Sequence, residues 1–486
     1  MKFNFNPLKI GLSLLLVAFM ALPSAAEVTL ARVFSSNMVL QQGRDIPVWG
    51  WASPGEKIRV TFKGTTARVK TMKNGSWNVT LPASDYGGPF TMEIKGKNTI
   101  VLENVMVGEV WICSGQSNME FPVSRSNDAT NEISHAGFPD IRLFTVPRAI
   151  RQYPSGNIEN GQWMVCSPET VPGFSAVAYF FARELYNDLK VPVGVIHTSW
   201  GATTAETWTS AQTIRNNPDL IDHLAELLIL DSDSFMKNVK KPNMYPTLLF
   251  NGMINPLVPY GIRGVIWYQG ESNAARARQY EKIFPDLIND WRRHWGLGDF
   301  PFLFVSLANF REPCSAPCES AWAELREAQT KTLRLPNTGM AVAIDIGKAD
   351  DIHPGNKQDV AKRLALNALK IAYNKNVVYS GPIYQSMEIK DGMAHIRFNH
   401  VADGLVAKDK YGYVKGFTVA GEDRVFHWAR ARITDANTVV VFCDVVKNPV
   451  AVRYGWADNP DDLNLYNSAG LPANPFRTDD WPGITQ

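Results

Sequence analysis

The sequence predicts an α/β protein built on a parallel sheet, with β-rich regions before and after it. Between residues 105 and 377, short apolar segments alternate with helical segments, which indicates parallel strands covered by helices on both faces. Residues 27–104 and 378–486 instead alternate apolar and polar side chains between glycine turns, as half-buried strands do. The chain of 486 residues is too long for one ordinary core, so several domains are expected.

The first segment, residues 1–26, has the features of a secretory signal peptide. Lys2 and Lys9 precede an apolar run over 10–20, and the small residues 24–26 follow it. The run is shorter than the roughly 20 residues that a membrane-spanning helix needs, so a cleaved signal is favoured over an anchor. We expect an exported protein, periplasmic or extracellular, with no membrane span after the signal is removed.

The overall composition limits the ligands of this chain. Its 49 basic and 47 acidic residues nearly cancel, which argues against a nucleic-acid partner. No Cys and His cluster has the spacing of a zinc site, so no metal is expected. Cys314 and Cys318 lie close enough in sequence for a local disulfide, which is only slightly favoured over a free pair. The sequence does not determine the oligomeric state.

Residues 27–104 are predicted to form a small β-sandwich. Apolar and polar residues alternate over 58–62 and again over 77–81, and Asn74-Gly75 between them is a hairpin signal. A structural cap on the next domain is favoured over a sugar-binding role.

The central region, 105–377, is predicted to hold the catalytic sheet. The expected strands are 105–113, 193–197, 264–268, 302–307 and 340–344, and the expected helices are 176–190, 280–295, 322–333 and 357–372. The long connection 203–260, with a helix over 219–230, is typical of a lid or binding loop. Strands over 394–398, 439–442 and 450–454 indicate that 378–486 is a C-terminal β-rich region.

Polar side chains follow several of these strands. The segments are Gly115-Gln116-Ser117-Asn118, His197 to Gly201, Gln269 to Asn273, and Asp350 to His353. Ligands of parallel sheets bind at the carboxyl ends of the strands, so we expect these segments to meet in one crevice.

Ser117 is the candidate nucleophile, because it stands where an apolar strand enters a tight polar turn. A serine needs a base and a group that orients it. His353, beside Pro354, is the preferred base and His197 the competing one. Asp350, three residues before His353, can reach the imidazole. A structural alternative is that Asp350 and its neighbour only solvate the loop while His353 caps the next helix.

The oxyanion of such a reaction needs N–H donors. The backbone groups of Ser117 and Gly201 are candidates, with the side-chain amide of Gln269 or Asn273 completing the set. Glu271 either holds those amides in place or only braces the loop as a buried carboxylate.

Together these segments, with Met119, Trp267-Tyr268 and Asp351-Ile352-His353-Pro354, resemble the sialate O-acetylesterase branch of the SGNH hydrolases. The resemblance covers nearly the whole mature chain. It implies a flavodoxin-like three-layer α/β/α hydrolase domain that removes O-acetyl groups from sugars without a metal or organic cofactor.

The same resemblance implies a role for each motif residue. It makes Ser117 the nucleophile and His353 the base, and its Asp-x-x-His spacing selects Asp350, with Asp351 or a backbone carbonyl as alternatives. It places Gly201 and Gln269 in the oxyanion hole, Gln269 being favoured over Asn273. The remaining motif residues, Gln116, Asn118, Glu271 and Asn273, are expected to bind substrate or support the site.

We therefore expect an exported carbohydrate esterase that hydrolyses O-acetyl esters of sialic acid. Two alternatives remain: an acetyl esterase for plant polysaccharide such as xylan, and a sugar-binding protein without catalysis. The carboxylate of sialic acid is a ligand for arginine. Arg276 and Arg278 follow the third motif and could reach the crevice, but surface solvation is favoured as their role.

Overall fold

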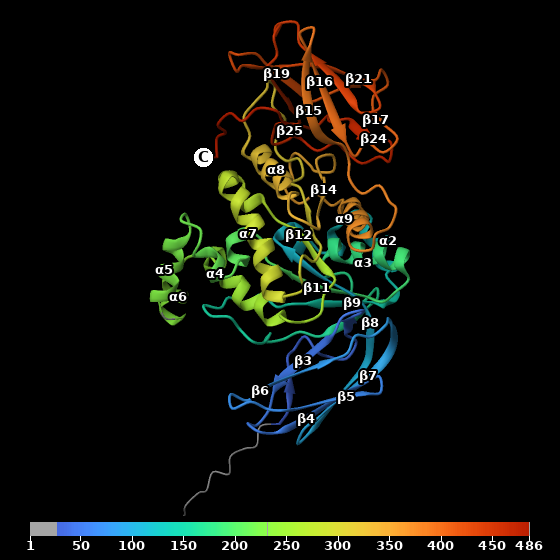
Figure 1. Cartoon of the computed structure of the whole chain (residues 1–486), viewed down its shortest axis with the longest axis vertical. Coiled ribbons are helices and arrows are strands. Elements are labelled where there is room, and N and C mark those ends of the chain that lie inside the picture. The colour runs from blue at the N-terminus through green and yellow to red at the C-terminus, as the bar shows by residue number, and fades with distance from the viewer. Residues whose placement is uncertain (1–26, 231, 486) are drawn as a thin grey trace, which may run out of the picture.

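The computed structural model describes residues 27–230 and 232–485, which form an elongated molecule in three tiers (Figure 1). N-terminal strands form one end, an α/β region the middle, and C-terminal strands the other end. The predicted signal peptide, residues 1–26, lies outside the described residues. Among the described residues, no helix combines the length and apolar character that crossing a membrane would require.

The N-terminal tier contains two groups of strands. One sheet is β1 (Thr29–Leu30), β3 (Ile46–Trp51) and β6 (Ser76–Leu81), and the second group is β2 (Val39–Gln41), β4 (Lys57–Phe62), β5 (Thr65–Lys70) and β7 (Gly87–Lys95). Asn74 and Gly75 do form a turn, but β5 pairs with β4 whereas β6 pairs with β3. The hairpin prediction is therefore wrong. Alternation of apolar residues identifies the face of a strand that is buried, and it does not identify the neighbouring strand.

The longest strand, β8 (Thr99–Gly115), connects the first two tiers. Its first half pairs with β7, and its second half pairs in parallel with β11 and β12 of the central sheet. The predicted boundary at residue 104 lies inside this strand. The strand that leads to Ser117 is thus held by hydrogen bonds along its whole length.

The central sheet confirms the α/β class. Its order is β10 (Trp163–Cys166), β9 (Phe138–Thr145), β11 (Val193–Ser199), β8, β12 (Gly264–Tyr268), β13 (Phe302–Val305) and β14 (Thr338–Ala341). Neighbours from β9 to β14 are parallel, and β10 is antiparallel to β9. The sheet is therefore mixed, because the edge strand β10 runs against the others.

Helices cover both faces of this sheet. They are α3 (Ala176–Leu189), α7 (Ala277–Trp295), α8 (Ala321–Thr332) and α9 (Lys357–Ile371). Successive residues of β8 point to opposite faces. Trp111 and Cys113 pack in the same core as α3 and α9, whereas Ile112 packs in the core that contains α7. This two-sided burial explains why the strand is apolar at consecutive positions.

The long connection between β11 and β12 contains short helices. These are α4 (Ala211–Ile214), α5 (Ile221–Ile229) and α6 (Ser232–Asn238), and α5 corresponds to the helix predicted over 219–230. They lie beside α7 at one side of the molecule (Figure 1). A short helix, α1 (Ser117–Glu120), follows β8 directly, and α2 (Ala129–Ser134) comes later in the same connection.

The C-terminal tier consists of antiparallel sheets. The larger ones are β15 (Ile383–Lys390), β16 (Met393–Asn399), β22 (Thr438–Phe442), β21 (Arg430–Asp435) and β18 (Tyr413–Val414), and β20 (Phe426–Trp428), β19 (Phe417–Ala420), β23 (Ala451–Tyr454) and β25 (Phe476–Arg477). A two-stranded sheet joins β17 (Leu405–Ala407) to β24 (Leu465–Asn467).

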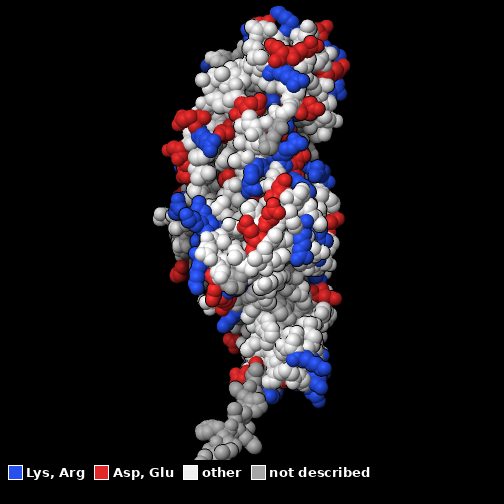
Figure 2. Space-filling view, turned by 90° about the vertical axis from the view of Figure 1, so that its left-hand side faces the viewer, with Lys and Arg blue, Asp and Glu red and all other residues white. Residues whose placement is uncertain are grey.

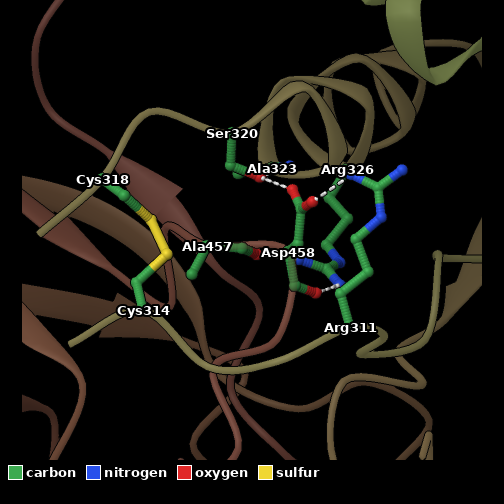
Figure 3. The surroundings of a disulfide bond; sticks show 8 residues. All are labelled: Arg311, Cys314, Cys318, Ser320, Ala323, Arg326, Ala457 and Asp458. Atoms are coloured by element: carbon green, nitrogen blue, oxygen red, sulfur yellow. Dashed lines mark hydrogen bonds and ion pairs between the residues drawn. A yellow bond between two sulfur atoms is a disulfide. The ribbon is translucent and has the colours of Figure 1, made fainter. Parts of the chain in front are cut away.

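A loop of the central region is fastened to this tier. Cys314 and Cys318 form a disulfide, and the nearby Asp458 accepts hydrogen bonds from Arg311 (2.7 Å) and Ser320 (2.5 Å) (Figure 3). The disulfide alternative for the two cysteines is therefore the one that the structure contains. Figure 2 shows acidic and basic side chains interspersed over one face of the molecule, in keeping with the nearly balanced composition.

Candidate active site

The register of the central sheet brings the polar segments together. Gly115 at the end of β8 lies opposite Ser199 of β11 on one side and Tyr268 of β12 on the other. The three strands therefore end at the same level, and the residues that follow them share one edge of the sheet.

The turn before the nucleophile depends on a glycine. Gly115 has a φ of +139°, and a Cβ atom at this position would lie 2.1 Å from the carbonyl oxygen of Tyr268. Gln116 then donates its backbone N–H to the same oxygen (3.0 Å), and its side-chain oxygen accepts from the N–H groups of Gly270 (3.4 Å) and Ser272 (3.3 Å). Gln116 thus fixes the third motif against the first, which leaves Ser117 at the start of α1.

Ser117 and His353 lie within hydrogen-bonding distance. The Oγ atom of Ser117 is 2.8 Å from Nε2 of His353, and both residues are only half-buried, so a substrate can reach them. His353 stands in the loop between β14 and α9, as expected for a base delivered by the last strand of the sheet. The competing base, His197, is buried and lies 2.5 Å from the hydroxyl of Ser199. Burial lowers the pKa of His197 to about 4, and the charge of Arg148 acts in the same direction.

The carboxylate close to His353 belongs to Asp351. The Asp-x-x-His spacing in the sequence instead selects Asp350. The Oδ1 atom of Asp351 lies 3.8 Å from Nδ1 of the imidazole and accepts the backbone N–H of His353 at 2.8 Å. Asp350 is exposed, and among the described residues no hydrogen bond or ion pair joins it to His353. Of the two adjacent carboxylates, that of Asp351 is therefore the one close to the imidazole.

The environment of His353 favours a neutral imidazole. Partial burial lowers the pKa of His353, and the positive charges of Lys357 and Arg125 lower it further, while Asp351 opposes them. A neutral imidazole beside a hydroxyl is ready to accept its proton.

The predicted oxyanion donor Gly201 lies against the nucleophile, but another group accepts its N–H. A Cβ atom on Gly201 would be 3.3 Å from Cβ of Ser117, so the two residues are in contact. The backbone N–H of Gly201 donates to Oε2 of Glu120 at 2.9 Å. Glu120 is also ion-paired with Arg148, whose guanidinium lies 5.2 Å from the ring of Trp200.

The amide of Gln269 is not free to donate to an oxyanion in this structure. Its NH₂ group donates to the carbonyl of Thr203 (3.2 Å) and to Oδ1 of Asn273 (2.7 Å), which uses both hydrogens. The amide nitrogen of Asn273 donates to Glu206 at 2.9 Å, and its second hydrogen has no acceptor among the residues that the structure describes. Of the two amides that the sequence leaves in competition, Asn273 therefore retains the capacity that the role requires.

The remaining motif residues form a buried network behind the nucleophile. Asn118 donates to Oε1 of Glu271 (2.6 Å) and to the carbonyl of Ile352 (3.0 Å), and its oxygen accepts from Nζ of Lys357 at 2.6 Å. Glu271 therefore holds Asn118, not the amides of the third strand end. Burial raises the pKa of Glu271.

Sequence reasoning missed several of these residues. Glu120, Glu206 and Lys357 lie outside the quoted motifs, and their contacts depend on segments far apart in the chain. One signal was available for Lys357, because a lysine in the first turn of a helix opposes the helix dipole and needs another explanation.

Comparison with known proteins agrees with this geometry. Residues 107–370 match the family described as "Carbohydrate esterase, sialic acid-specific acetylesterase". The chain is 30% identical to the sialate O-acetylesterase of Mus musculus, covering 96% of this chain and 97% of that protein. It is also 30% identical to the sialate O-acetylesterase of Homo sapiens, covering 98% of each.

A solved structure is similar over most of the chain. The crystal structure of a carbohydrate acetylesterase from Xanthomonas citri matches with a TM-score of 0.86 and 41% sequence identity, covering 94% of this chain and 100% of the other. These findings confirm the resemblance inferred from the motifs: the chain belongs to the sialic acid-specific acetylesterase family and is a carbohydrate esterase.

Proposed function

We propose that this protein is an exported esterase that hydrolyses O-acetyl esters of sialic acid with Ser117 as the nucleophile. The observation that carries the proposal is the 2.8 Å distance between Oγ of Ser117 and Nε2 of His353 at the carboxyl edge of the sheet. The catalytic unit is proposed to be the flavodoxin-like three-layer hydrolase domain of residues 105–377. Residues 27–104 and 378–486 are its flanking β-sandwich and β-rich units.

The reaction proceeds in two transfers. Oγ of Ser117 attacks the acetyl carbonyl carbon while His353 takes the hydroxyl proton, and the same proton then passes to the departing sugar oxygen. This leaves an acetyl group on Ser117. A water molecule deprotonated by His353 attacks that ester, releases acetate and restores the serine. Asp351 orients the imidazole in place of Asp350.

The oxyanion is stabilised by N–H groups around Ser117. We assign the backbone N–H groups of Ser117 and Gly201 to this role, together with the amide of Asn273. Since Gly201 donates to Glu120 in the structure, the acetyl oxygen has to displace that carboxylate. Arg148, which is ion-paired with Glu120, is placed to hold the displaced carboxylate.

The nucleophile is tested by Ser117→Ala. Loss of the attacking oxygen should reduce kcat for acetate release by about 10⁴- to 10⁶-fold, because the histidine alone cannot form the acetyl intermediate. Acetate is measured with O-acetylated sialic acid as substrate, and circular dichroism checks the fold. Ser134→Ala, at an exposed serine of α2, is the matched control and should retain wild-type kcat. Near-normal acetate release by Ser117→Ala would refute the mechanism.

An unpaired arginine beside the site supports a substrate that carries a carboxylate. Arg125 is exposed, lies 4.8 Å from the ring of Phe121, and forms no ion pair with a carboxylate of the described residues. Its charge lowers the pKa of both His353 and Lys357, which places it near the reacting groups. A guanidinium can bind a carboxylate through two parallel hydrogen bonds. Sialic acid offers that group, and neutral acetylated xylan does not.

Arg125→Gln separates the two substrate classes. We expect kcat/KM for O-acetylated sialic acid to fall about 10- to 100-fold, as for loss of a charge-assisted hydrogen bond. The value for acetylated xylan without uronic acid groups should stay unchanged. Arg278→Gln, at an exposed arginine on α7, is the control. A wild-type preference for xylan that Arg125→Gln does not alter would favour the polysaccharide esterase.

A further inference from the structure

Lys357 is a buried cation in an unfavourable position. It is the first residue of α9 and is 0% exposed, although lysine is almost never fully buried without a partner. The helix dipole at this end disfavours a positive charge. Two aromatic rings lie near the ammonium, Phe121 at 4.8 Å and Tyr268 at 5.3 Å, and they offset part of this cost.

The hydrogen bond from Lys357 determines the orientation of an amide. Nζ lies 2.6 Å from Oδ1 of Asn118, and an ammonium can only donate, so the oxygen of the amide must face it. The NH₂ group of Asn118 is thereby directed to the opposite side, where it donates to Oε1 of Glu271 and to the carbonyl of Ile352. A flipped amide would place two donors against each other and two acceptors against each other.

This amide joins the two segments that carry the reacting side chains. Asn118 follows Ser117 in α1, and Ile352 precedes His353 in the loop after β14. The bond between Asn118 and Ile352 therefore ties the backbone of the nucleophile to the backbone of the base.

We propose that Lys357 is a positioning residue of the esterase: by fixing the amide of Asn118 between Glu271 and Ile352, it holds Ser117 and His353 at bonding distance. The proposal rests on the roles assigned above to Ser117 and His353. Lys357 itself is not within reach of the substrate, because its side chain is enclosed by Asn118, Phe121 and Tyr268.

The charges around Lys357 indicate that it also affects the pKa of His353. The carboxylates of Glu271 and Asp351 and the guanidinium of Arg125 act on its charge, and His353 lies in the loop just before α9. Burial lowers the pKa of Lys357 to about 7, although both carboxylates oppose this change. Over the acidic range in which His353 titrates, Lys357 is thus charged, and its charge disfavours the imidazolium.

The test is Lys357→Met, which keeps an unbranched side chain as far as Cε and removes the donor and the charge at Nζ. With 4-nitrophenyl acetate as substrate, kcat should fall about 10- to 100-fold with KM nearly unchanged, as expected for misplaced catalytic groups. The acid limb of kcat/KM should move to higher pH, since the pKa of His353 rises when the nearby charge is lost. Lys357→Gln restores a donor without charge and should recover part of kcat while keeping the shifted limb. Lys362→Met, at an exposed lysine of the same helix, should leave both quantities unchanged.

Loss of Lys357 leaves the carboxylate of Glu271 buried without a counter-charge, so the melting temperature of each variant is measured first. The double variant Lys357→Met/Glu271→Gln removes that carboxylate and should regain stability but not kcat. Wild-type kcat and an unshifted acid limb in a folded Lys357 variant would overturn the proposal. Failure of all three variants to fold would also overturn it, because Lys357 would then be purely structural.

Ser117→Ala is assayed in parallel. If that variant hydrolyses 4-nitrophenyl acetate normally, the assigned nucleophile is wrong, whatever Lys357 does.

Discussion

The protonation state of His353 limits the proposed reaction, because only the neutral imidazole can accept the proton of Ser117. Its pKa is lowered first by burial and then by the charges of Lys357 and Arg125, and only Asp351 acts in the opposite direction. The acid limb of kcat/KM should therefore lie below the ordinary histidine value of 6.5. Activity should fall as the pH drops through the lowered pKa of His353.

Asp351→Asn tests which carboxylate serves this histidine. Removal of the negative charge should move the acid limb to still lower pH, since the opposing contribution is lost. kcat should fall about 10-fold, which is less than for a fully buried triad carboxylate, because the contact is long and partly solvated. Asp350→Asn is the matched control and should change neither quantity. The opposite result, with Asp350→Asn inactive and Asp351→Asn normal, would restore the residue that the sequence spacing selects. Both profiles are measured as acetate release in a pH-stat.

At the scale of elements, the sequence predicts those helices and strands whose pattern of buried residues can be recognised within the element alone. The strand predicted over 264–268 has the same bounds as β12, and the helices α3 and α9 differ from their predictions by one residue at the C-terminal end. Two-sided burial and helical periodicity are local signals, so no knowledge of neighbours was needed.

Other strands form only because they pair with neighbouring strands, and the sequence does not show which strands those are. The prediction omitted β9 and β10, since β9 contains Pro139 and Asp140 and β10 is an edge strand paired with β9 alone. The site divides in the same way. Ser117 and His353 can be predicted because each stands after a strand of the sheet. That the amide of Gln269 donates both of its hydrogens to Thr203 and Asn273 depends on the packing of distant segments, which the sequence does not show.

At the scale of the whole molecule, the buried guanidinium of Arg326 is one of the groups that join the central and C-terminal tiers. Arg326 of α8 donates to the carbonyls of Leu307 (2.8 Å) and Ala308 (2.9 Å), which follow β13, and to those of Ala457 (2.7 Å) and Asp458 (2.9 Å) in the C-terminal tier. Figure 3 shows this arginine between helix α8 and the segment that carries Asp458. A planar guanidinium can serve carbonyls on both sides at once, which an ammonium cannot do.

Arg326→Met should therefore lower the stability of the protein more than the same substitution at an exposed arginine does. The substitution leaves buried carbonyl groups without donors on both sides of the junction, at a cost of about 3–5 kcal/mol. Arg326→Lys should recover only part of this loss, because a single ammonium cannot reach both pairs of carbonyls. Arg430→Met removes an exposed ion pair with Asp444 and should change stability by less than about 1 kcal/mol. Urea unfolding followed by tryptophan fluorescence measures all three variants. If Arg326→Met unfolds at the wild-type midpoint, the apolar contacts between the tiers hold them together without the guanidinium, and the hydrogen bonds only fix their register.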